Sequence, residues 1–310
     1  MTPDGTGAAA LRARRILRLD FTVADFAPTR RFYEALGFGV LGRAALDEAE
    51  MASLGLAGSR AERLGRRLGR QVVGVVRFDP PGRAYPAGSS SSDLWFQLIA
   101  IAVSDMAEAH RRAMAAGARP ITQGGPQTLP ANTGGVTAFK FRDPDGHPLE
   151  LLFFPAGTGA APWHEPGVGS PFLGIDHTAI AVGHTAEVQA FYEGLGLAPG
   201  AGSHNRGLGQ ERLDDVAAVR VEVVPMTLPQ QPPHVELLGY EVGRRRPMPP
   251  ETRADDIWAT RIWIEVESLA GAAVDRTTVF RDGTRALHMS DPDGHAVVLA
   301  ERSGPSNEQR

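Results

Sequence analysis

The sequence predicts an α+β fold made of repeated units, each with one strand, one helix and then further strands. The pentapeptide Asp-Pro-Asp-Gly-His occurs twice, at Asp143–His147 and at Asp291–His295. Each copy lies between two apolar runs, and Pro and Gly in that setting are typical of a tight hairpin turn. Because the same hairpin recurs near the end of the chain, we expect one structural unit to be present more than once.

The other elements of the unit recur in the same order. A strand at 19–24 precedes a helix containing Phe32–Phe38, and a strand at 175–180 precedes a helix containing Phe191–Leu197 with nearly the same residues. In both helices Phe and Leu share one face, and the Gly after Leu is a helix C-cap. Fainter copies of the strand and helix are expected at Phe96–Val103 with Met106–Ala116, and at Ala259–Val266 with Leu269–Val274. The strands of the two hairpins are expected at Val136–Phe141 and Leu149–Phe154, and at Arg285–Met289 and Ala296–Ala300. The chain is therefore predicted to contain four units, arranged as two homologous halves.

The length and the linker composition indicate two domains. The 310 residues suffice for two domains of about 150 residues each. The stretch 155–171 is rich in Gly, Pro and Ala, which is typical of an interdomain linker. We therefore predict a first domain at 16–154 and a second at 172–302. Residues 1–15 are expected to form a disordered N-terminal tail, and residues 303–310 a C-terminal tail.

Composition excludes several classes of function. The net charge of −4 gives no field that would attract nucleic acid or an anionic membrane. The chain has no cysteine, which excludes disulfides, thiolate metal sites and cysteine nucleophiles, and favours a cytoplasmic location. The sequence has no apolar run of membrane-spanning length, no phosphate-binding glycine loop and no dinucleotide-binding motif.

Four stretches together resemble the vicinal oxygen chelate superfamily. They are Asp176–Val182, Phe191–Gly196, Pro233–Tyr240 and the Asp-Pro-Asp-Gly-His hairpin with its following Glu-Leu. This superfamily includes glyoxalase I, methylmalonyl-CoA epimerase, fosfomycin and bleomycin resistance proteins, and type I extradiol dioxygenases. The resemblance implies four βαβββ modules that pair into two glyoxalase-like domains, each with a cupped mixed sheet. Four modules complete two cavities in one chain, so either a monomer or a homodimer is expected.

The resemblance also implies where a metal would be bound. Family members that use a metal place its ligands on the first and last strands of each paired module. In the first half these positions correspond to Phe21, Gly74, Leu98 and Glu150. In the second half they correspond to His177, Glu236, Arg261 and Val298. Three of the four positions in the first half cannot bind a cation, so that half is predicted to lack a metal site.

The second set of positions disfavours an extradiol dioxygenase. Such an enzyme would need two histidines and a carboxylate around Fe(II), whereas a guanidinium at Arg261 offers no lone pair. The prediction is therefore a site without a cofactor. A divalent metal (Fe, Mn, Ni or Zn) held by His177 and Glu236 stays an alternative, with His234 or His204 as a third ligand.

The polar residues of the second cup are the candidate catalytic residues. His177 and Glu236 suit general bases, because burial raises a carboxylate pKa toward neutrality. Arg261 would hold a substrate carboxylate or a developing enolate oxygen. Equally, Glu236 and Arg261 could form a structural ion pair.

Further residues are candidate substrate contacts. His234 and Tyr240 are expected on the same strand as Glu236, and Glu150 is expected to line a cavity in the first half. His204, Asn205 and Glu211 belong to a polar, Gly-rich segment of the kind that often borders a pocket. By contrast, His147 and His295 each follow a turn glycine and are expected to satisfy backbone groups.

These observations predict an enzyme that acts on a small oxygenated molecule, either polyketide-like or aromatic. The chemistry would be acid–base isomerisation, elimination or cyclisation in the second-domain cavity. One alternative is a non-catalytic binding or resistance protein of the bleomycin-resistance type. Another is a metal-dependent lyase or dioxygenase with a degenerate site. The expected partner is a small molecule, with neither nucleic acid nor membrane.

Overall fold

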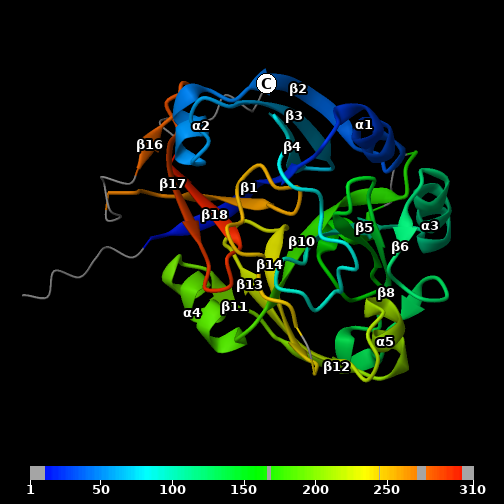
Figure 1. Ribbon diagram of the computed structural model, residues 1–310. Helices are drawn as coiled ribbons and strands as arrows, with labels where there is room; N and C mark the ends of the chain where they lie inside the picture. The colour runs from blue at the N-terminus through cyan, green and yellow to red at the C-terminus, as the bar shows by residue number, and fades with distance from the viewer. Residues whose placement is uncertain (1–10, 166–168, 244, 271–276, 302–310) are drawn as a thin grey trace, which may run out of the picture.

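The computed structural model describes residues 11–165, 169–243, 245–270 and 277–301, and it contains four modules (Figure 1). The first module comprises β1 (Ala13–Thr22), α1 (Phe26–Ala35), β2 (Gly39–Ala45), α2 (Glu48–Ser53), β3 (Arg60–Leu68) and β4 (Gln71–Asp79). The second comprises β5 (Gln97–Val103), α3 (Met106–Ala115), β6 (Arg119–Pro120), β7 (Gln127–Thr128), the short helix η1 (Ala131–Thr133), β8 (Thr137–Arg142) and β9 (Pro148–Phe153). The predicted α+β class is confirmed.

The second half of the chain repeats this order. After the short helix η2 (Ala161–His164), the third module comprises β10 (Phe172–Val182), α4 (Thr185–Gly194), β11 (Ala198–Pro199), β12 (Ser203–Arg206), α5 (Leu208–Asp214), β13 (Arg220–Thr227) and β14 (His234–Glu241). The fourth comprises β15 (Arg261–Val266), β16 (Thr278–Val279), β17 (Arg285–Ser290) and β18 (Ala296–Glu301). Most of the helix predicted at Leu269–Val274 lies outside the described residues, as do residues 1–10 and the C-terminal tail 303–310. The predicted N-terminal tail is too long, because strand β1 already begins at Ala13.

The two sheets do not pair the first module with the second and the third with the fourth, which corrects the arrangement expected from the sequence. An eight-stranded sheet, here called sheet A, has the order β16-β17-β18-β15-β1-β4-β3-β2 and joins the fourth module to the first. A ten-stranded sheet, sheet B, has the order β11-β13-β14-β10-β5-β9-β8-β6 and joins the third module to the second. In Figure 1 the blue and orange-red strands accordingly lie together, and the green and yellow strands form the other sheet. Each sheet therefore takes one module from each half of the chain.

The register of the central strands corrects one assignment made from the sequence. In sheet B, His177 on β10 lies opposite Ala100 on β5, next to a register shift at Asp176. In sheet A, Arg18 on β1 lies opposite Trp263 on β15, next to a register shift at Leu17. The residue equivalent to His177 is therefore Arg18 and not Phe21. The sequence comparison slipped by three residues because it matched the Leu-Asp pair at 19–20 to the Ile-Asp pair at 175–176.

The duplicated hairpins tie the second module to the first and the fourth module to the third. His147 Nε2 lies 2.7 Å from the carbonyl oxygen of Thr22 on β1, and His295 Nε2 lies 3.0 Å from that of Ala181 on β10. The prediction that both histidines satisfy backbone groups is confirmed, although the carbonyl groups belong to the preceding module and not to the hairpin. Because the first and second modules lie in different sheets, as do the third and fourth, these hairpins fasten sheet A to sheet B.

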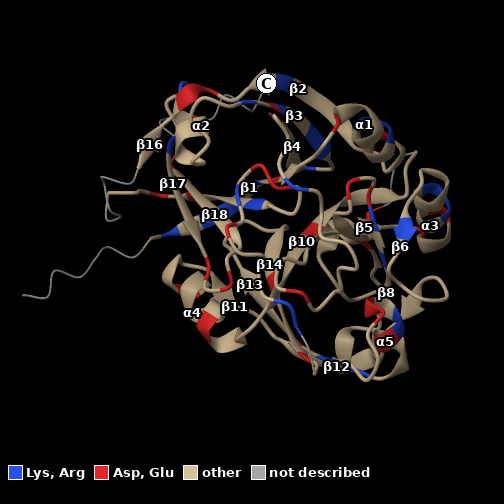
Figure 2. Cartoon of the chain, in the orientation of Figure 1, with Lys and Arg blue, Asp and Glu red and all other residues tan. Residues whose placement is uncertain are grey.

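The largest hydrophobic core draws on both sheets and on all four modules. It contains, for example, Phe21, Ile101, Ile180 and Ile264, with the buried faces of the helices. A second apolar cluster, including Leu98, Leu152, Val221 and Leu238, lies on the inner face of sheet B. No helix among the described residues is long and apolar enough to cross a membrane. Acidic and basic residues are interspersed along the chain (Figure 2).

Candidate active site

Sheet B encloses a cavity of about 170 Å³ that we call the sheet B cavity. Its polar lining residues are Thr133, Lys140, Glu150, Asp176, His177, Ser203, Asn205, Gln210, Glu236 and Tyr240. Its apolar lining residues are aliphatic except for Phe154. A few converging polar groups in an apolar cavity are typical of a small-molecule site.

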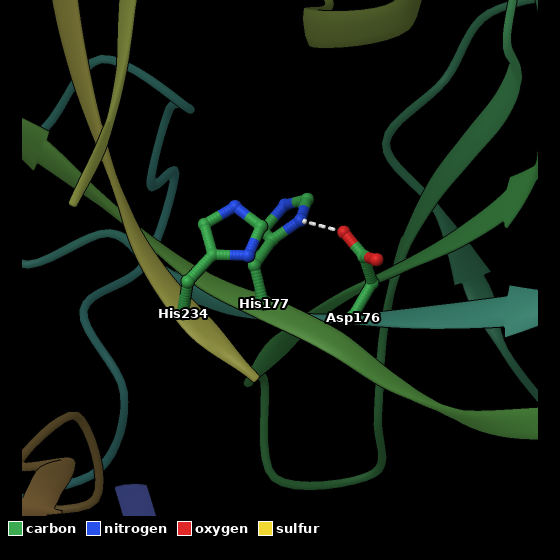
Figure 3. Close-up of side chains that lie close together, drawn as sticks. All are labelled: Asp176, His177 and His234. Carbon is green, nitrogen blue, oxygen red and sulfur yellow. Dashed lines mark hydrogen bonds and ion pairs between the residues drawn. The ribbon is translucent and has the colours of Figure 1, made fainter. Parts of the chain in front are cut away.

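His177 is the centre of the first polar group in this cavity. Its Nδ1 lies 2.9 Å from Oδ2 of Asp176, and its Nε2 lies 3.4 Å from Oε2 of Glu236. His234 is the neighbour of His177 across the parallel strands β10 and β14, and its Nε2 lies 3.4 Å from the other oxygen of Glu236. Figure 3 shows the two imidazole rings side by side, with Asp176 on the far side of His177. Strand pairing therefore brings together the predicted residues His177, His234 and Glu236.

The charges around His177 favour its protonated form. Burial alone disfavours the imidazolium, but the carboxylates of Glu236 and Asp176 outweigh burial and raise the pKa of His177 to about 9. Burial likewise opposes ionisation of Glu236, yet the neighbouring His177 and His234 lower the pKa of this carboxyl. At neutral pH the site therefore holds an imidazolium between two carboxylates.

Asp176 accepts a hydrogen bond from a tryptophan of the linker, and the sequence did not predict this contact. The indole Nε1 of Trp163, in η2, donates a 2.5 Å hydrogen bond to Oδ1 of Asp176. Both side chains are buried. A hydrogen-bonded carboxylate on Nδ1 of a histidine orients the ring and fixes which nitrogen faces the cavity. No composition signal in the Gly- and Pro-rich stretch 155–171 marks Trp163 for this position.

Glu150 joins the same cavity from the first half of the chain. It lies on β9 beside Ala100 of β5, and Ala100 in turn lies opposite His177. Burial raises the pKa of the Glu150 carboxyl, although the nearby Lys140 partly offsets this effect. The sequence assigned Glu150 to a separate cavity, because it paired the first module with the second. Three of the positions carried over from the family therefore converge here, and the fourth, Leu98, belongs to the apolar cluster.

A second polar group lies around the carboxylate of Asp214, the last residue of α5. Lys140 Nζ lies 2.5 Å from Oδ1 of Asp214, and Gln210 Nε2 donates to Oδ2 at 2.6 Å. The hydroxyl of Tyr240 lies close enough to Asp214 for this carboxylate, together with burial, to raise the tyrosine pKa. Sequence reasoning identified only Tyr240, but a signal was present: Lys140 is the only lysine in the chain.

An outer hollow of about 510 Å³ adjoins the sheet B cavity, and Thr133, Asn205, Gln210 and Val221 line both. The predicted contact Asn205 therefore lines the cavity, whereas His204 lines only the hollow outside it. Glu211 lies on α5 and lines neither space, so its contact with a ligand stays a prediction.

Arg261 is not part of this site, which corrects the sequence prediction. It lies on β15 of sheet A, where its guanidinium donates to the carbonyl oxygen of Ala254 and to Oγ1 of Thr22. The Glu236–Arg261 ion pair therefore does not form, because the two residues belong to different sheets. The error follows from pairing the third module with the fourth.

The inner face of sheet A is filled by charged residues of its own. The buried carboxylate of Asp20 accepts hydrogen bonds from Arg18 and Arg63, and Glu50 of α2 pairs with Arg63. Arg18 also stacks on the indole of Trp263, with 3.6 Å between Cζ and the ring centre. Because Arg18 and Arg261 occupy two of the family's ligand positions, this cup has no donors there for a divalent cation.

The fold and the cavity define a class of protein in which paired βαβββ modules enclose a small-molecule site. Residues 15–151 match the family "Glyoxalase/Bleomycin resistance protein/Dioxygenase superfamily". Over these residues the match agrees with the resemblance that the motifs predicted. No curated protein matches the chain.

Solved structures share the fold at low sequence identity. Glyoxalase I from Zea mays is 17% identical, with a TM-score of 0.61, and the match covers 93% of this chain and 92% of that one. A putative dioxygenase from Bacillus subtilis is 11% identical, with a TM-score of 0.54, and the match covers 94% of this chain and 86% of that one. At these identities the likeness shows the fold alone.

Proposed function

We propose that this protein is an enzyme that acts on a small oxygenated molecule by acid–base chemistry in the sheet B cavity. The proposal rests on one observation: Glu150 lines the same cavity as His177 and Glu236, although Glu150 comes from the first half of the chain and the other two come from the second half. A carboxyl with a raised pKa beside a charged imidazole is the combination that proton transfer needs.

The residues have distinct roles in this proposal. Glu150, in its ionised form, removes a proton from the carbon beside a substrate carbonyl. The electron pair of that C–H bond moves to the carbonyl oxygen, where the positive charge of the His177 imidazolium stabilises the developing enolate. Glu236 and Asp176 keep His177 protonated and oriented. In an α-hydroxyketone, the hydroxyl proton then passes to the former carbonyl oxygen, and return of the proton from Glu150 to the former carbonyl carbon completes an isomerisation.

A divalent metal is a second candidate for part of the oxygen-stabilising role. Asp176, His177 and His234 fit such an ion, because each offers a ligand atom and these atoms all lie within 4.8 Å of one another. Glu236 is a further candidate ligand, because one of its oxygens lies 3.4 Å from Nε2 of His177 and the other lies 3.4 Å from Nε2 of His234. Imidazole and carboxylate are ligands that first-row divalent metals accept. When bound, the ion would polarise a substrate oxygen. In that case Glu150 keeps its role in proton transfer, and the ion replaces the imidazolium charge.

The experiment that tests the proposal is solvent-proton exchange, because simple ketones can report it even where the natural substrate is a different molecule. A panel of hydroxyketones and hydroxyaryl ketones is incubated with the protein in D₂O, and loss of the proton beside the carbonyl is followed by NMR. We expect enzyme-catalysed exchange for at least one compound. Compounds that bind without any exchange would favour the alternative of a sequestering protein. Metal content per chain, measured on protein prepared without chelator, separates the two forms of the site.

A further inference from the structure

The second polar group of the sheet B cavity contains hydrogen-bonding atoms that the protein leaves unused. The Tyr240 hydroxyl and Oε1 of Gln210 are buried and have no partner that meets the distance and angle of a hydrogen bond among the described residues, although Asp214 lies close enough to Tyr240 to raise its pKa. Both residues line the cavity, and each is more than nine-tenths buried. A buried polar atom without a partner costs roughly 1–3 kcal/mol, so two of them in one cavity call for an explanation.

Lys140 adds donors to the same place. One of its three N–H groups faces Asp214, and no other hydrogen bond from Nζ occurs among the described residues. Asp214 outweighs burial and raises the pKa of Lys140 well above its ordinary value, so the amine stays protonated. Lys140 is therefore a hydrogen-bond donor here and not a nucleophile.

The local charge restricts what can bind at this point. Asp214 neutralises Lys140, and the other two polar groups, of Tyr240 and Gln210, are uncharged at neutral pH. An anionic group would therefore find no net positive charge to offset its desolvation. A carbonyl oxygen would accept from Tyr240 or Lys140 but would leave Oε1 of Gln210 unpaired. A hydroxyl both accepts and donates, and so it satisfies all three.

We propose that Lys140, Gln210 and Tyr240 form a recognition site for a hydroxyl group of the ligand. This inference deepens the proposed function: the substrate is a small molecule with an apolar body, a reacting oxygen near His177 and a neutral hydroxyl near Tyr240. The size of the cavity agrees with this class. A cavity of about 150 Å³ admits one benzene ring, and the sheet B cavity has about 170 Å³.

The test compares two unreactive probes of equal shape, phenol and toluene, by isothermal titration calorimetry. We expect phenol to bind about tenfold more tightly, the value of one to two neutral hydrogen bonds, although toluene is the more apolar probe. Equal affinities, or tighter binding of toluene, would overturn the proposal. Benzoate is the third probe, and tighter binding of benzoate than of phenol would overturn the assignment to a neutral hydroxyl.

Two substitutions locate the effect. Tyr240→Phe removes only the hydroxyl and should abolish most of the preference for phenol, with toluene affinity unchanged. Because this hydroxyl makes no hydrogen bond in the ligand-free protein, Tyr240→Phe should not lower the Tm. Tyr192→Phe is the matched control, since the Tyr192 hydroxyl is also buried without a hydrogen bond but lies outside the cavity. A preference for phenol that persists in Tyr240→Phe, or is lost equally in Tyr192→Phe, would contradict the proposal.

The single lysine supplies an independent readout. Protein labelled with ¹⁵N-lysine carries one side-chain ammonium, that of Lys140. We expect phenol, but not toluene, to shift its NMR signal, and a signal unaffected by phenol would place the hydroxyl elsewhere. These measurements involve no turnover. If phenol binds as expected but no ketone exchanges its proton, the cavity binds hydroxylated molecules without transforming them. If a ketone exchanges its proton but phenol is not preferred, the proposed hydroxyl site is wrong and the proposed function stands.

Discussion

At the scale of single residues, burial and neighbouring charge give similar side chains different properties. Glu236 and Glu150 line one cavity, yet the pKa of Glu236 is lowered by two histidines, whereas burial raises that of Glu150. His288, in sheet A, shows the opposite behaviour to His177, since burial and nearby arginines lower its pKa to about 4. Residue type alone therefore does not identify the acid, the base or the charged imidazole, because the neighbouring residues set the pKa of each group.

The raised pKa of Glu150 predicts how its substitution affects stability. A carboxyl whose pKa is higher in the folded state stabilises the protein below its unfolded pKa, and this contribution is lost as pH rises through the folded value. The Gln side chain of the Glu150→Gln variant is neutral at every pH, so the stability of this variant does not fall by that mechanism. We therefore expect the Tm of Glu150→Gln relative to wild type to rise between pH 4 and pH 8. Thermal unfolding across this range measures it, and a difference that falls with pH would contradict the account.

At the scale of elements, local patterns predicted most strands and helices, because each depends on periodicity and turn residues. Strand β8, for example, is expected at Val136–Phe141 and occurs at Thr137–Arg142. The role of the duplicated hairpins could be predicted only in part from the sequence. The sequence indicates a turn, but their contacts with the preceding strand depend on tertiary packing. The same holds for η2, whose Trp163 reaches Asp176 from a stretch that composition marks only as a linker.

The contact of Trp163 with Asp176 gives a prediction for the linker. Trp163→Phe keeps most of the apolar surface but leaves one oxygen of a buried carboxylate without its donor. We expect it to lower the free energy of unfolding by about 1–3 kcal/mol, measured by urea denaturation. Trp95→Phe is the control, because Trp95 is equally buried and donates to the neutral Ser89 hydroxyl. A Trp163→Phe variant no less stable than Trp95→Phe would show that the hydrogen bond to Asp176 does not contribute to the free energy of unfolding.

At the scale of the whole molecule, the sequence predicted two cupped sheets but not which modules share them. Both pairings bury similar apolar faces, so periodicity does not distinguish them; the choice depends on how the inner strands β1, β5, β10 and β15 meet. The pairing of the modules determines which residues form the candidate site. It brings Glu150 to His177 and separates Arg261 from Glu236. The residue types were therefore predictable, whereas their grouping was not.

The pairing of modules can be tested with a disulfide, because the natural chain has no cysteine. Leu98 on β5 and Ala179 on β10 are direct partners in sheet B. Opposite residues of antiparallel strands lie about 4.5–5.5 Å apart, which a disulfide spans. We expect the double variant Leu98→Cys/Ala179→Cys to form an intramolecular disulfide on oxidation, detected by a mass lower by two hydrogen atoms. Leu98→Cys alone is the control. A double variant that stays reduced, or links only between chains, would contradict this topology.

The central claim is that the functional site is the sheet B cavity, assembled from both halves of the chain. The most direct measurement is the rate of solvent-deuterium exchange into a responsive ketone by wild type, Glu150→Gln and His288→Gln. His288→Gln is the matched variant, since it changes a polar residue on the inner face of sheet A at the position equivalent to Lys140. We predict that Glu150→Gln loses at least about 100-fold in rate, the usual contribution of a general base, and that His288→Gln keeps the wild-type rate. Full activity in Glu150→Gln, with loss in His288→Gln, would place the chemistry in the other cup and contradict the account.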